Sequence, residues 1–361
     1  MYKILTINPG STSTKIAIYH DENEVFIKTI RHQTEELAPF ERVADEFEFR
    51  RDIIIKELKN EGFNINEFDL IVGRGGLIAP IPSGVFEVNE NMKQELREAK
   101  RGEHASNLGA LIADDIAKEI NKNNGNNKVK AVIVDPVVVD EMNDVARISG
   151  HPLFPRLSIF HALNQKAIAR LYAKENKKKY EDLNLIVVHL GGGISVGAHC
   201  KGKVIDTNDA LNGEGPFSSQ RSGGLTPGQI VEACYSGKYT KDQMKLMVNG
   251  EGGLVAHLGT NSALEVEQKA EKGEAKYKLI QDALCYGTAK MIGAMATVLK
   301  GKVDAIILTG GIAYNKYLVE YVKDMVGFIA PISVYPGEDE MKALAINGLM
   351  MLKGEIKLNQ Y

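Results

Sequence analysis

The chain has 361 residues, and its 44 Lys and Arg residues against 47 Asp and Glu residues give it a formal net charge of −3. A charge this close to zero argues against binding to nucleic acid or to an anionic membrane surface. The composition, 44% hydrophobic and 25% charged, is that of an ordinary globular protein. The length predicts two hydrophobic cores, because single cores tend to divide beyond about 250 to 300 residues.

The cysteines and the apolar runs bear on where in the cell the protein is located. Cys200, Cys234 and Cys285 lack the spacing of a zinc site, and an odd number cannot all pair in disulfides, so we expect a reducing environment. No run approaches the roughly 18 apolar residues of a membrane helix. The N-terminal apolar run, residues 4–7, stops at Asn8 and is too short for a signal peptide. We expect a cytoplasmic protein with no membrane partner.

The first predicted elements form a β-meander. Residues 3–8 and 15–19 are typical of two strands joined by a turn rich in Gly, Ser and Thr, and residues 25–27 continue as a third strand. Just past the middle of the chain the same pattern returns, with strands at residues 185–190 and 194–200 joined by three glycines. A third strand follows here too, at residues 204–206.

Two further strands occur in the same order in each half. Residues 70–72 and residues 305–308 are apolar, and both runs end in glycine-rich loops. Because this repeat is far longer than the roughly 20 to 50 residues of a stacked repeat, it indicates gene duplication rather than a solenoid. We expect two α/β lobes, residues 1–155 and 156–339, with a C-terminal helix over about residues 340–361 packing back on the first.

Helices are predicted between the strands. Apolar residues recur at helical spacing within residues 108–120 and again within residues 280–295. Ser262 followed by Glu265 has the spacing of a capping box at the start of another helix.

Two of the glycine-containing turns are candidate phosphate loops. In the first, Gly10, Ser11, Ser13 and Lys15 offer backbone N–H groups, hydroxyls and a cation with little competing bulk. A tight hairpin with Ser and Thr as turn formers is the alternative. In the second, three glycines follow His189, and such a run costs conformational entropy unless the backbone must lie close to a ligand. Matching positions in a duplicated chain favour phosphate binding for both.

A third loop leads from a strand into a helix over residues 309–315, a topology that suits a nucleotide at the carboxyl end of a strand. It is neither a Walker loop nor a G-x-G-x-x-G fingerprint, which disfavours P-loop enzymes and Rossmann dehydrogenases.

Charged residues beside glycines and at strand ends are the next candidates. Arg74 and Arg221 each lie among glycines, which we expect to leave the guanidinium groups accessible for bidentate binding of a carboxylate or phosphate. Surface arginines in flexible loops are the alternative. Asp135 ends an apolar strand, where burial of a carboxylate needs a cation or a donor. It is either a metal-linked or substrate-facing residue, or a cap before Pro136.

Three histidines, His104, His161 and His189, stand at starts of helices or loops, and the residues alone leave structural and functional roles equally open. Their spacing is not that of a zinc motif.

Seven motifs taken in order along nearly the whole chain resemble those of the acetokinase family. They are Ile7-Asn8-Pro9-Gly10-Ser11-Thr12-Ser13-Thr14-Lys15, Gly73-Arg74-Gly75-Gly76, Val134-Asp135-Pro136, Phe160-His161-Ala162, His189-Leu190-Gly191-Gly192-Gly193, Arg221-Ser222-Gly223 and Thr309-Gly310-Gly311-Ile312. The ordered set is far more specific than any one loop. The resemblance implies a duplicated actin-like (ribonuclease H-like) α/β ATPase fold, with ATP in a cleft between an acid-binding first lobe and a nucleotide-binding second lobe.

The resemblance also implies roles for individual residues. The phosphates would be bound by Asn8, Gly10, Ser11, Ser13, Lys15, His189, Gly191, Gly192 and Gly193, and the adenosine by Gly310, Gly311 and Ile312. The catalytic residues would be Arg74 and Arg221, which contact the carboxylate and the transferring phosphoryl group, with Asp135 and His161. Mg²⁺ would be linked to Asn8, Asp135 and one residue of the acidic stretch 338–340, for which we favour Glu340.

The activity that the resemblance implies is reversible transfer of the ATP γ-phosphoryl group to a short-chain fatty acid, giving acyl phosphate and ADP, by a homo-oligomeric enzyme. The chain lacks the histidines that flank the arginine of the acetate branch, and it has Gly192 where that branch has an asparagine. We therefore expect butyrate or a branched-chain analogue rather than acetate, with residues 77–82 and 137–138 as candidate apolar walls. An acetate or propionate kinase and an actin-like nucleotide-binding switch are the alternatives.

Overall fold

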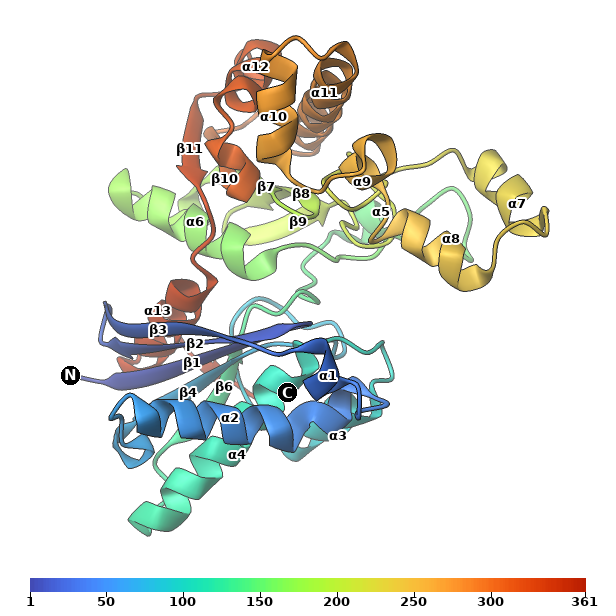
Figure 1. Cartoon of the computed structure of the whole chain (residues 1–361). Coiled ribbons are helices and arrows are strands. Elements are labelled where there is room, and N and C mark those ends of the chain that lie inside the picture. Colours follow the sequence, from blue (N-terminus) through green and yellow to red (C-terminus); the bar gives the residue numbers. More distant parts are fainter. The chain divides into compact units, whose positions relative to one another are not determined.

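The computed structural model describes residues 1–361 and divides them into two compact units. Unit 1 combines Met1–Val139 with Asp339–Tyr361, and unit 2 is Asp140–Glu338. Each unit is a β-sheet with helices on its faces (Figure 1).

Unit 1 contains a seven-stranded sheet in the order β12-β5-β6-β4-β1-β2-β3. Its strands are β1 (Lys3–Gly10), β2 (Ser13–His20), β3 (Asn23–Arg31), β4 (Leu70–Arg74), β5 (Val85–Glu87), β6 (Lys130–Val134) and β12 (Leu358–Asn359). Its helices are α1 (Thr34–Leu37), α2 (Phe47–Asn60), α3 (Glu90–Glu98), α4 (Asn107–Asn124) and α13 (Glu340–Leu352), with short 3₁₀ turns at η1 (Val43–Glu46) and η2 (Ile65–Glu67).

Glycines allow helices to approach both faces of this sheet. A Cβ atom on Gly73 of β4 would lie 2.3 Å from the carbonyl oxygen of Gly109 in α4. On the opposite face, a Cβ atom on Gly348 of α13 would lie within 3 Å of the side chains of Leu70 and Val72. Because side chains alternate along a strand, α4 and α13 pack on opposite faces of the sheet.

Unit 2 contains a five-stranded sheet in the order β11-β10-β7-β8-β9. Its strands are β7 (Asn184–Leu190), β8 (Ile194–Cys200), β9 (Lys203–Thr207), β10 (Ala305–Gly310) and β11 (Ile332–Pro336). Its helices are α5 (Asp144–Arg147), α6 (Ala162–Glu175), α7 (Pro227–Tyr235), α8 (Lys241–Val248), α9 (Gly253–Leu258), α10 (Ala263–Glu271), α11 (Ala275–Val298) and α12 (Lys316–Val326), with 3₁₀ turns at η3 (Tyr180–Asp182) and η4 (Gly311–Tyr314).

The two faces of the unit 2 sheet are buried in separate clusters. Ile186 and Val188 of β7 pack with α11 and α12, whereas Leu185 and Val187 of the same strand pack with α6. Figure 1 shows α6 on one side of the sheet and α10, α11 and α12 on the other. A strand buried on both faces reads as a continuous apolar run, as residues 185–188 do.

The two sheets share one topology. Each has an antiparallel meander, β1-β2-β3 or β7-β8-β9, and the first strand of each meander pairs in parallel with a later strand, β4 or β10. That strand in turn pairs in parallel with β6 or β11. The repeated meander and the later strands at residues 70–72 and 305–308, which the sequence predicts, are confirmed.

Two details differ from the sequence predictions. The units divide at Val139, before the expected boundary at residue 155, because residues 140–156 bond within unit 2: Lys166 Nζ donates to Glu141 Oε2 at 2.6 Å and Arg156 Nε donates to Glu214 Oε1 at 2.6 Å. Ser262 caps α10, but the Glu265 carboxylate accepts from Thr260 Oγ1 instead of completing a capping box.

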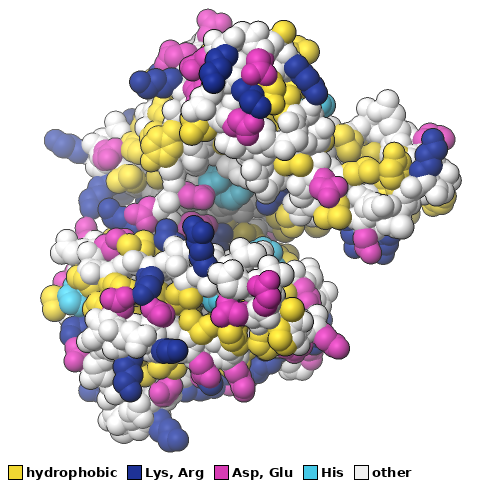
Figure 2. Space-filling view, viewed as in Figure 1, with side chains coloured by type: hydrophobic (Ala, Val, Ile, Leu, Met, Phe, Trp, Pro, Cys, Tyr) yellow, Lys and Arg dark blue, Asp and Glu magenta, His cyan; other side chains and the backbone are white.

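The surface is mixed in charge. In the view of Figure 2, basic and acidic side chains are interspersed with no patch of a single sign, in keeping with the small net charge. Apolar side chains are exposed over α7 and α8, among them Val231, Tyr235 and Leu246. None of the helices is both long and apolar enough to cross a membrane.

Candidate functional site

The candidate residues of unit 1 gather where β1, β4 and β6 end. These strands are neighbours and run parallel, so Asn8, Arg74 and Asp135 all lie at or just beyond their carboxyl ends. Ligands of open α/β sheets bind at that edge. Asn8 and Arg74 also share a face of the sheet, because Thr6 pairs with Val72 and side chains alternate along both strands.

Glu340, the first residue of α13, joins Asn8 and Arg74. Asn8 Nδ2 donates to Glu340 Oε2 at 2.7 Å, and Arg74 Nη1 lies 2.8 Å from Glu340 Oε1. Arg74 is only 7% exposed, so the expectation of an accessible guanidinium is wrong: β4 is a buried strand, and Glu340 neutralises the cation. The ion pair does not align as a hydrogen bond, and the buried Nη1 atom has no hydrogen-bond partner. This atom retains a donor for an anionic ligand.

The phosphate-loop candidates of unit 1 share one face of a hairpin. Asn8 lies opposite Lys15, and Gly10 lies opposite Ser13, in the antiparallel register of β1 and β2. Ser11 is exposed at the tip. The sequence therefore places an amide, a cation and hydroxyl groups on the same face as Arg74.

Arg50 of α2 is a residue that the sequence analysis missed. Its guanidinium is 1% exposed and donates to the carbonyl oxygens of Gly10 at 2.7 Å, Ser11 at 3.0 Å and Ser13 at 3.1 Å. Glu46 neutralises it at 2.6 Å. Arg50 thus fixes the backbone of the hairpin tip from the face opposite the candidate residues.

Asp135 is fully buried and lies in the left-handed region, with φ 35°. Ser83 Oγ and the backbone N–H of Gly84 donate to its Oδ1 atom at 2.6 and 2.8 Å. These donors offset the cost of burying the carboxylate. A buried non-glycine residue with positive φ costs strain and directs attention to function, but the metal or catalytic role of Asp135 stays a prediction.

The residues of unit 1 fit a magnesium ion. Mg²⁺ is usually held by one or two carboxylates together with phosphate oxygens and water, and Glu340 and Asn8 supply a carboxylate and an amide oxygen beside the phosphate-loop face. Of the neighbouring acidic residues, Asp339 caps α13 by accepting from the Lys342 N–H, and Glu338 belongs to unit 2. Glu340 is therefore the best-placed of the three for the metal.

In unit 2, His161 and His189 stack on each other. Their ring centroids are 3.8 Å apart and their planes differ by 12°. His189 is the penultimate residue of β7, and its Nδ1 atom lies 2.8 Å from Asn164 Oδ1, whereas His161 immediately precedes α6. Glu338 Oε2 lies 3.3 Å from His189 Nε2. By contrast, His104 bonds Ser106 Oγ at the start of α4 in unit 1.

Gly191 to Gly193 and Arg221 form a second loop cluster in unit 2. A Cβ atom on Gly193 would lie 1.9 Å from Arg221 Nη1, and one on Gly191 would lie 2.9 Å from His189 Nε2. Arg221 Nη1 donates to the carbonyl of Ala210 at 2.7 Å, and burial lowers the pKa of this guanidinium. The missing side chains therefore make room for Arg221 and His189, and the expectation of an accessible Arg221 is only partly met.

The third loop follows β10, next to β7. Gly310 has φ 91°, and a Cβ atom on it would lie 2.3 Å from the carbonyl oxygen of Leu190, so no other residue fits there. Gly311 has open space around it. The Ile312 side chain is only 8% exposed within the core, so a ligand at this loop would meet mainly backbone.

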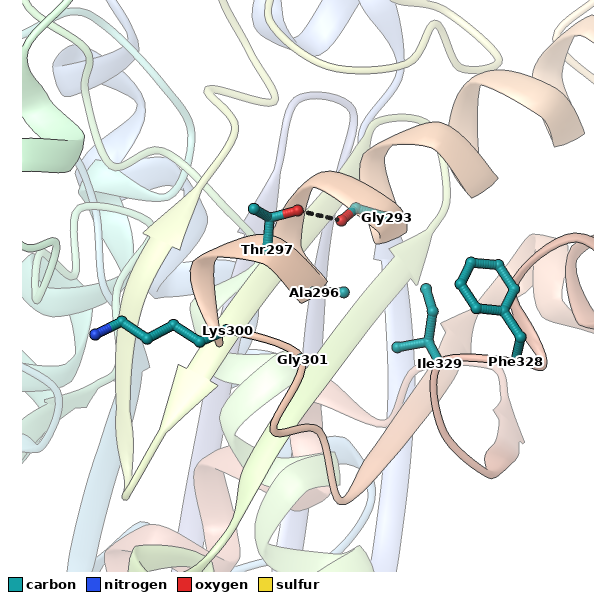
Figure 3. A pocket seen from close by; sticks show the side chains of 7 residues that line it. All are labelled: Gly293, Ala296, Thr297, Lys300, Gly301, Phe328 and Ile329. Carbon is teal, nitrogen blue, oxygen red and sulfur yellow. Dashed lines mark hydrogen bonds between the residues drawn. The ribbon is translucent and has the colours of Figure 1, made fainter.

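A surface groove elsewhere in unit 2 is separate from these loops. It is lined by residues of the C-terminal part of α11 and by Phe328 and Ile329 (Figure 3). These residues precede β10 and β11, so the groove lies at the amino ends of the strands, opposite to the edge that carries His189 and Gly310.

Two solved structures share the fold of this chain. An acetate kinase of Porphyromonas gingivalis superimposes with a TM-score of 0.79 at 19% identity, over 98% of this chain and 100% of that one. A propionate kinase from Francisella tularensis subsp. tularensis SCHU S4 gives a TM-score of 0.74 at 18% identity, over 96% and 99%. The chain has the duplicated actin-like ATPase fold that the sequence predicts.

Sequence comparison is more specific. The sequence profile of the Acetokinase family matches residues 156–331. Butyrate kinase 2 of Clostridium acetobutylicum is 54% identical over 100% of this chain and 99% of its own length, and a probable butyrate kinase of Bacteroides thetaiotaomicron is 53% identical over 99% of both. The chain belongs to the acetokinase family, as its ordered motifs predict.

Proposed function

We propose that this chain transfers the γ-phosphoryl group of ATP reversibly to the carboxylate of a short-chain fatty acid, butyrate or a branched-chain analogue, to give acyl phosphate and ADP. The observation that carries the proposal is the identity of 54% over the whole chain to a protein named butyrate kinase. The buried donor of Arg74 and the loops at the strand ends of each unit support it.

The charges of the reactants dictate what the residues do. A carboxylic acid with a pKa near that of Asp or Glu is already ionised at neutral pH, so no base is needed to remove a proton from the acceptor. The barrier is repulsion between an anionic nucleophile and an anionic phosphoryl group, which cations and N–H donors offset in an in-line transition state.

The residues divide these tasks. Arg74 binds the acid through its guanidinium, whose Nη1 atom forms an ion pair with Glu340 but no aligned hydrogen bond. Arg221 and His161 neutralise the oxygens of the transferring phosphoryl group. Asp135, which accepts from Ser83 Oγ and the Gly84 N–H, orients groups around the metal rather than acting as a base. Glu340 and Asn8 would hold Mg²⁺, which would supply positive charge at the phosphate oxygens.

The nucleotide occupies the loops at the strand ends. The glycine loops after β7 and β10, with His189, offer backbone N–H groups to the phosphates and to adenosine. In unit 1, Ser11, Ser13 and Lys15 offer hydroxyl groups and a cation for phosphate. The protein is proposed to be cytoplasmic and homo-oligomeric, and the exposed apolar side chains of α7 and α8 support self-association.

Trapping acyl phosphate as its hydroxamate tests the proposal directly. The purified chain is incubated with ATP, Mg²⁺ and each of butyrate, isobutyrate, propionate and acetate, and kcat/KM is compared. The largest value for butyrate or isobutyrate is expected. The largest value for acetate or propionate would assign a different acid, and ATP binding without hydroxamate from any acid would favour a nucleotide-dependent switch.

A further inference from the structure

A chain of hydrogen bonds runs from the interior of unit 2 to His161. It links Tyr180 OH to His199 Nδ1 at 2.7 Å, His199 Nε2 to Gln165 Oε1 at 3.0 Å, Gln165 Nε2 to Ser195 Oγ at 2.8 Å, and Ser195 Oγ to His161 Nδ1 at 2.8 Å. Gln165, Ser195 and His199 are fully buried. Buried polar groups that are completely bonded specify one arrangement.

The glycine of β8 at position 197 is part of this arrangement. A Cβ atom on Gly197 would lie 2.4 Å from Gln165 Oε1 and 3.1 Å from His199 Nε2. The sequence thus leaves out a side chain where the glutamine and the histidine meet.

The position of each proton follows from the donors and acceptors. Gln165 Nε2 also lies 3.1 Å from the backbone carbonyl oxygen of Ser195, so the amide nitrogen points toward Ser195 and the amide oxygen toward His199. His199 therefore donates from Nε2 and accepts at Nδ1 from the Tyr180 hydroxyl. Burial lowers the pKa of His199 well below its usual value, which agrees with a neutral ring.

The same reasoning about donors and acceptors gives the tautomer of His161. Ser195 Oγ accepts from Gln165 Nε2 at 2.8 Å and from the backbone N–H of His161 at 3.4 Å, so its own proton is directed to His161 Nδ1. A neutral imidazole that accepts at Nδ1 carries its proton at Nε2. The stacked His189 differs, because the atom that faces its Nδ1 is an acceptor, Asn164 Oδ1.

We propose that Ser195 and Gln165 are positioning residues that hold His161 in the Nε2–H tautomer, so that it presents a neutral N–H donor to the transferring phosphoryl group. The tautomer itself is a property of unit 2. Only the role of the donor rests on the proposed function. A neutral His161 also avoids two positive rings in a stack with centroids 3.8 Å apart.

The tautomer is read by NMR of the full chain with ¹⁵N-labelled histidine, with the His161 signals assigned by their loss in His161→Gln. The expected result is a protonated Nε2 and an unprotonated Nδ1 at neutral pH. Gln165→Glu removes the amide donor, so the Ser195 hydroxyl turns to the carboxylate and His161 Nδ1 becomes the donor. Ser195→Ala removes the partner of Nδ1 altogether and is expected to give a mixture of tautomers.

Kinetics gives a second readout. Ser195→Ala is expected to lower kcat about 10-fold, with the KM for ATP and acid nearly unchanged. This is less than the roughly 10²- to 10⁴-fold contribution of a positioned acid or base, because His161 itself stays in place. Ser106→Ala is the matched control, because this buried serine also bonds a histidine Nδ1 but lies in unit 1, outside the chain of bonds. It is expected to leave both kcat and the His161 signals unchanged.

The outcomes separate the two proposals. A protonated Nδ1 in the native protein, or an unchanged His161 tautomer in both Ser195→Ala and Gln165→Glu, overturns the inference whatever the activity. Absence of acyl phosphate with every acid overturns the proposed function and leaves the tautomer measurement intact.

Discussion

Equivalent hairpin tips in the two units are held by different means. The β1–β2 tip of unit 1 is rich in hydroxyl side chains, and Arg50 fixes its carbonyl groups from outside. The β7–β8 tip of unit 2 has three glycines, and Ser218 Oγ donates to the carbonyl of Gly192 at 2.6 Å while Arg221 fills the space beside Gly193. One tip keeps its hydroxyl side chains, and the other lacks side chains where Arg221 lies against its backbone.

The largest effect is expected at the cation of the glycine tip. Arg221→Ala should lower kcat by about 10³ or more, as for arginines that stabilise transferring phosphoryl groups, with a small change in the KM for ATP. Arg221→Lys keeps the charge but loses the planar fork, and should recover only part of the rate. Steady-state kinetics with butyrate measures kcat and the KM for ATP of both variants. A change confined to the KM for ATP would show that Arg221 binds nucleotide instead.

The corresponding test in unit 1 is Arg50→Met. It leaves Glu46 and the carbonyls of the tip without their cation, and breaking a buried pair in this way costs about 3–5 kcal/mol of stability. The midpoint of urea unfolding of unit 1 measures the loss. Arg51→Met on the same helix is the matched control, because its ion pairs lie at the surface and contribute at most about 1 kcal/mol. Equal losses for the two variants would contradict a special role for Arg50.

Alanine substitutions within the glycine tip sharpen the comparison. Gly193→Ala displaces the Arg221 guanidinium and should lower kcat by about 10²-fold, the effect of a misplacement near 1 Å. Gly192→Ala meets nothing closer than Gln220 Oε1 at 3.8 Å and should be nearly neutral. If the two variants lost activity equally, the close approach of Arg221 to Gly193 would not explain why this tip needs glycine.

The smallest effect concerns pH and the buried His199 behind the glycine tip. Burial lowers the pKa of His199 in the folded state, so below the unfolded value near 6.5 the unfolded chain binds a proton that the folded chain excludes. Stability should therefore be complete above about pH 6.5 and fall as the pH decreases, by up to about 1.4 kcal/mol per pH unit.

Urea unfolding at pH 7, 6 and 5 measures that slope. His199→Gln should show a shallower dependence than the native chain, and His151→Gln, at an exposed position, should keep the native slope. A slope unchanged by His199→Gln would mean that another group carries the pH dependence.

Much of the fold was predictable because its strands and turns have local sequence patterns. The strands at residues 3–8 and 185–190 are apolar runs that end in glycine or polar turns, and their repetition revealed the duplication before any tertiary contact was known. The boundary after residue 139 was not predictable, because the bonds of residues 140–156 to unit 2 join segments up to about sixty residues apart.

The site was predictable where strand ends carry the residues and not where distant elements complete it. Asn8, Arg74 and Asp135 were found because each follows an apolar run. Arg50 lies on a helix rich in charged residues, and nothing in its neighbours shows that it reaches a turn some forty positions earlier. The burial of Arg74 depends likewise on Glu340, far along the chain.

Unit 1 is built from two segments of the chain that flank unit 2, and this affects the order in which the units fold during synthesis. Its edge strand β12 and helix α13 come after all of unit 2 in the sequence, and the backbone carbonyl of Tyr361 accepts from Asn89 Nδ2 at 2.8 Å. A nascent chain can therefore complete the later unit first, while Arg74 still lacks its counter-ion. The ribosome delivers Glu340, the acidic partner of Arg74, only after all of unit 2 has been made, so the first unit matures last.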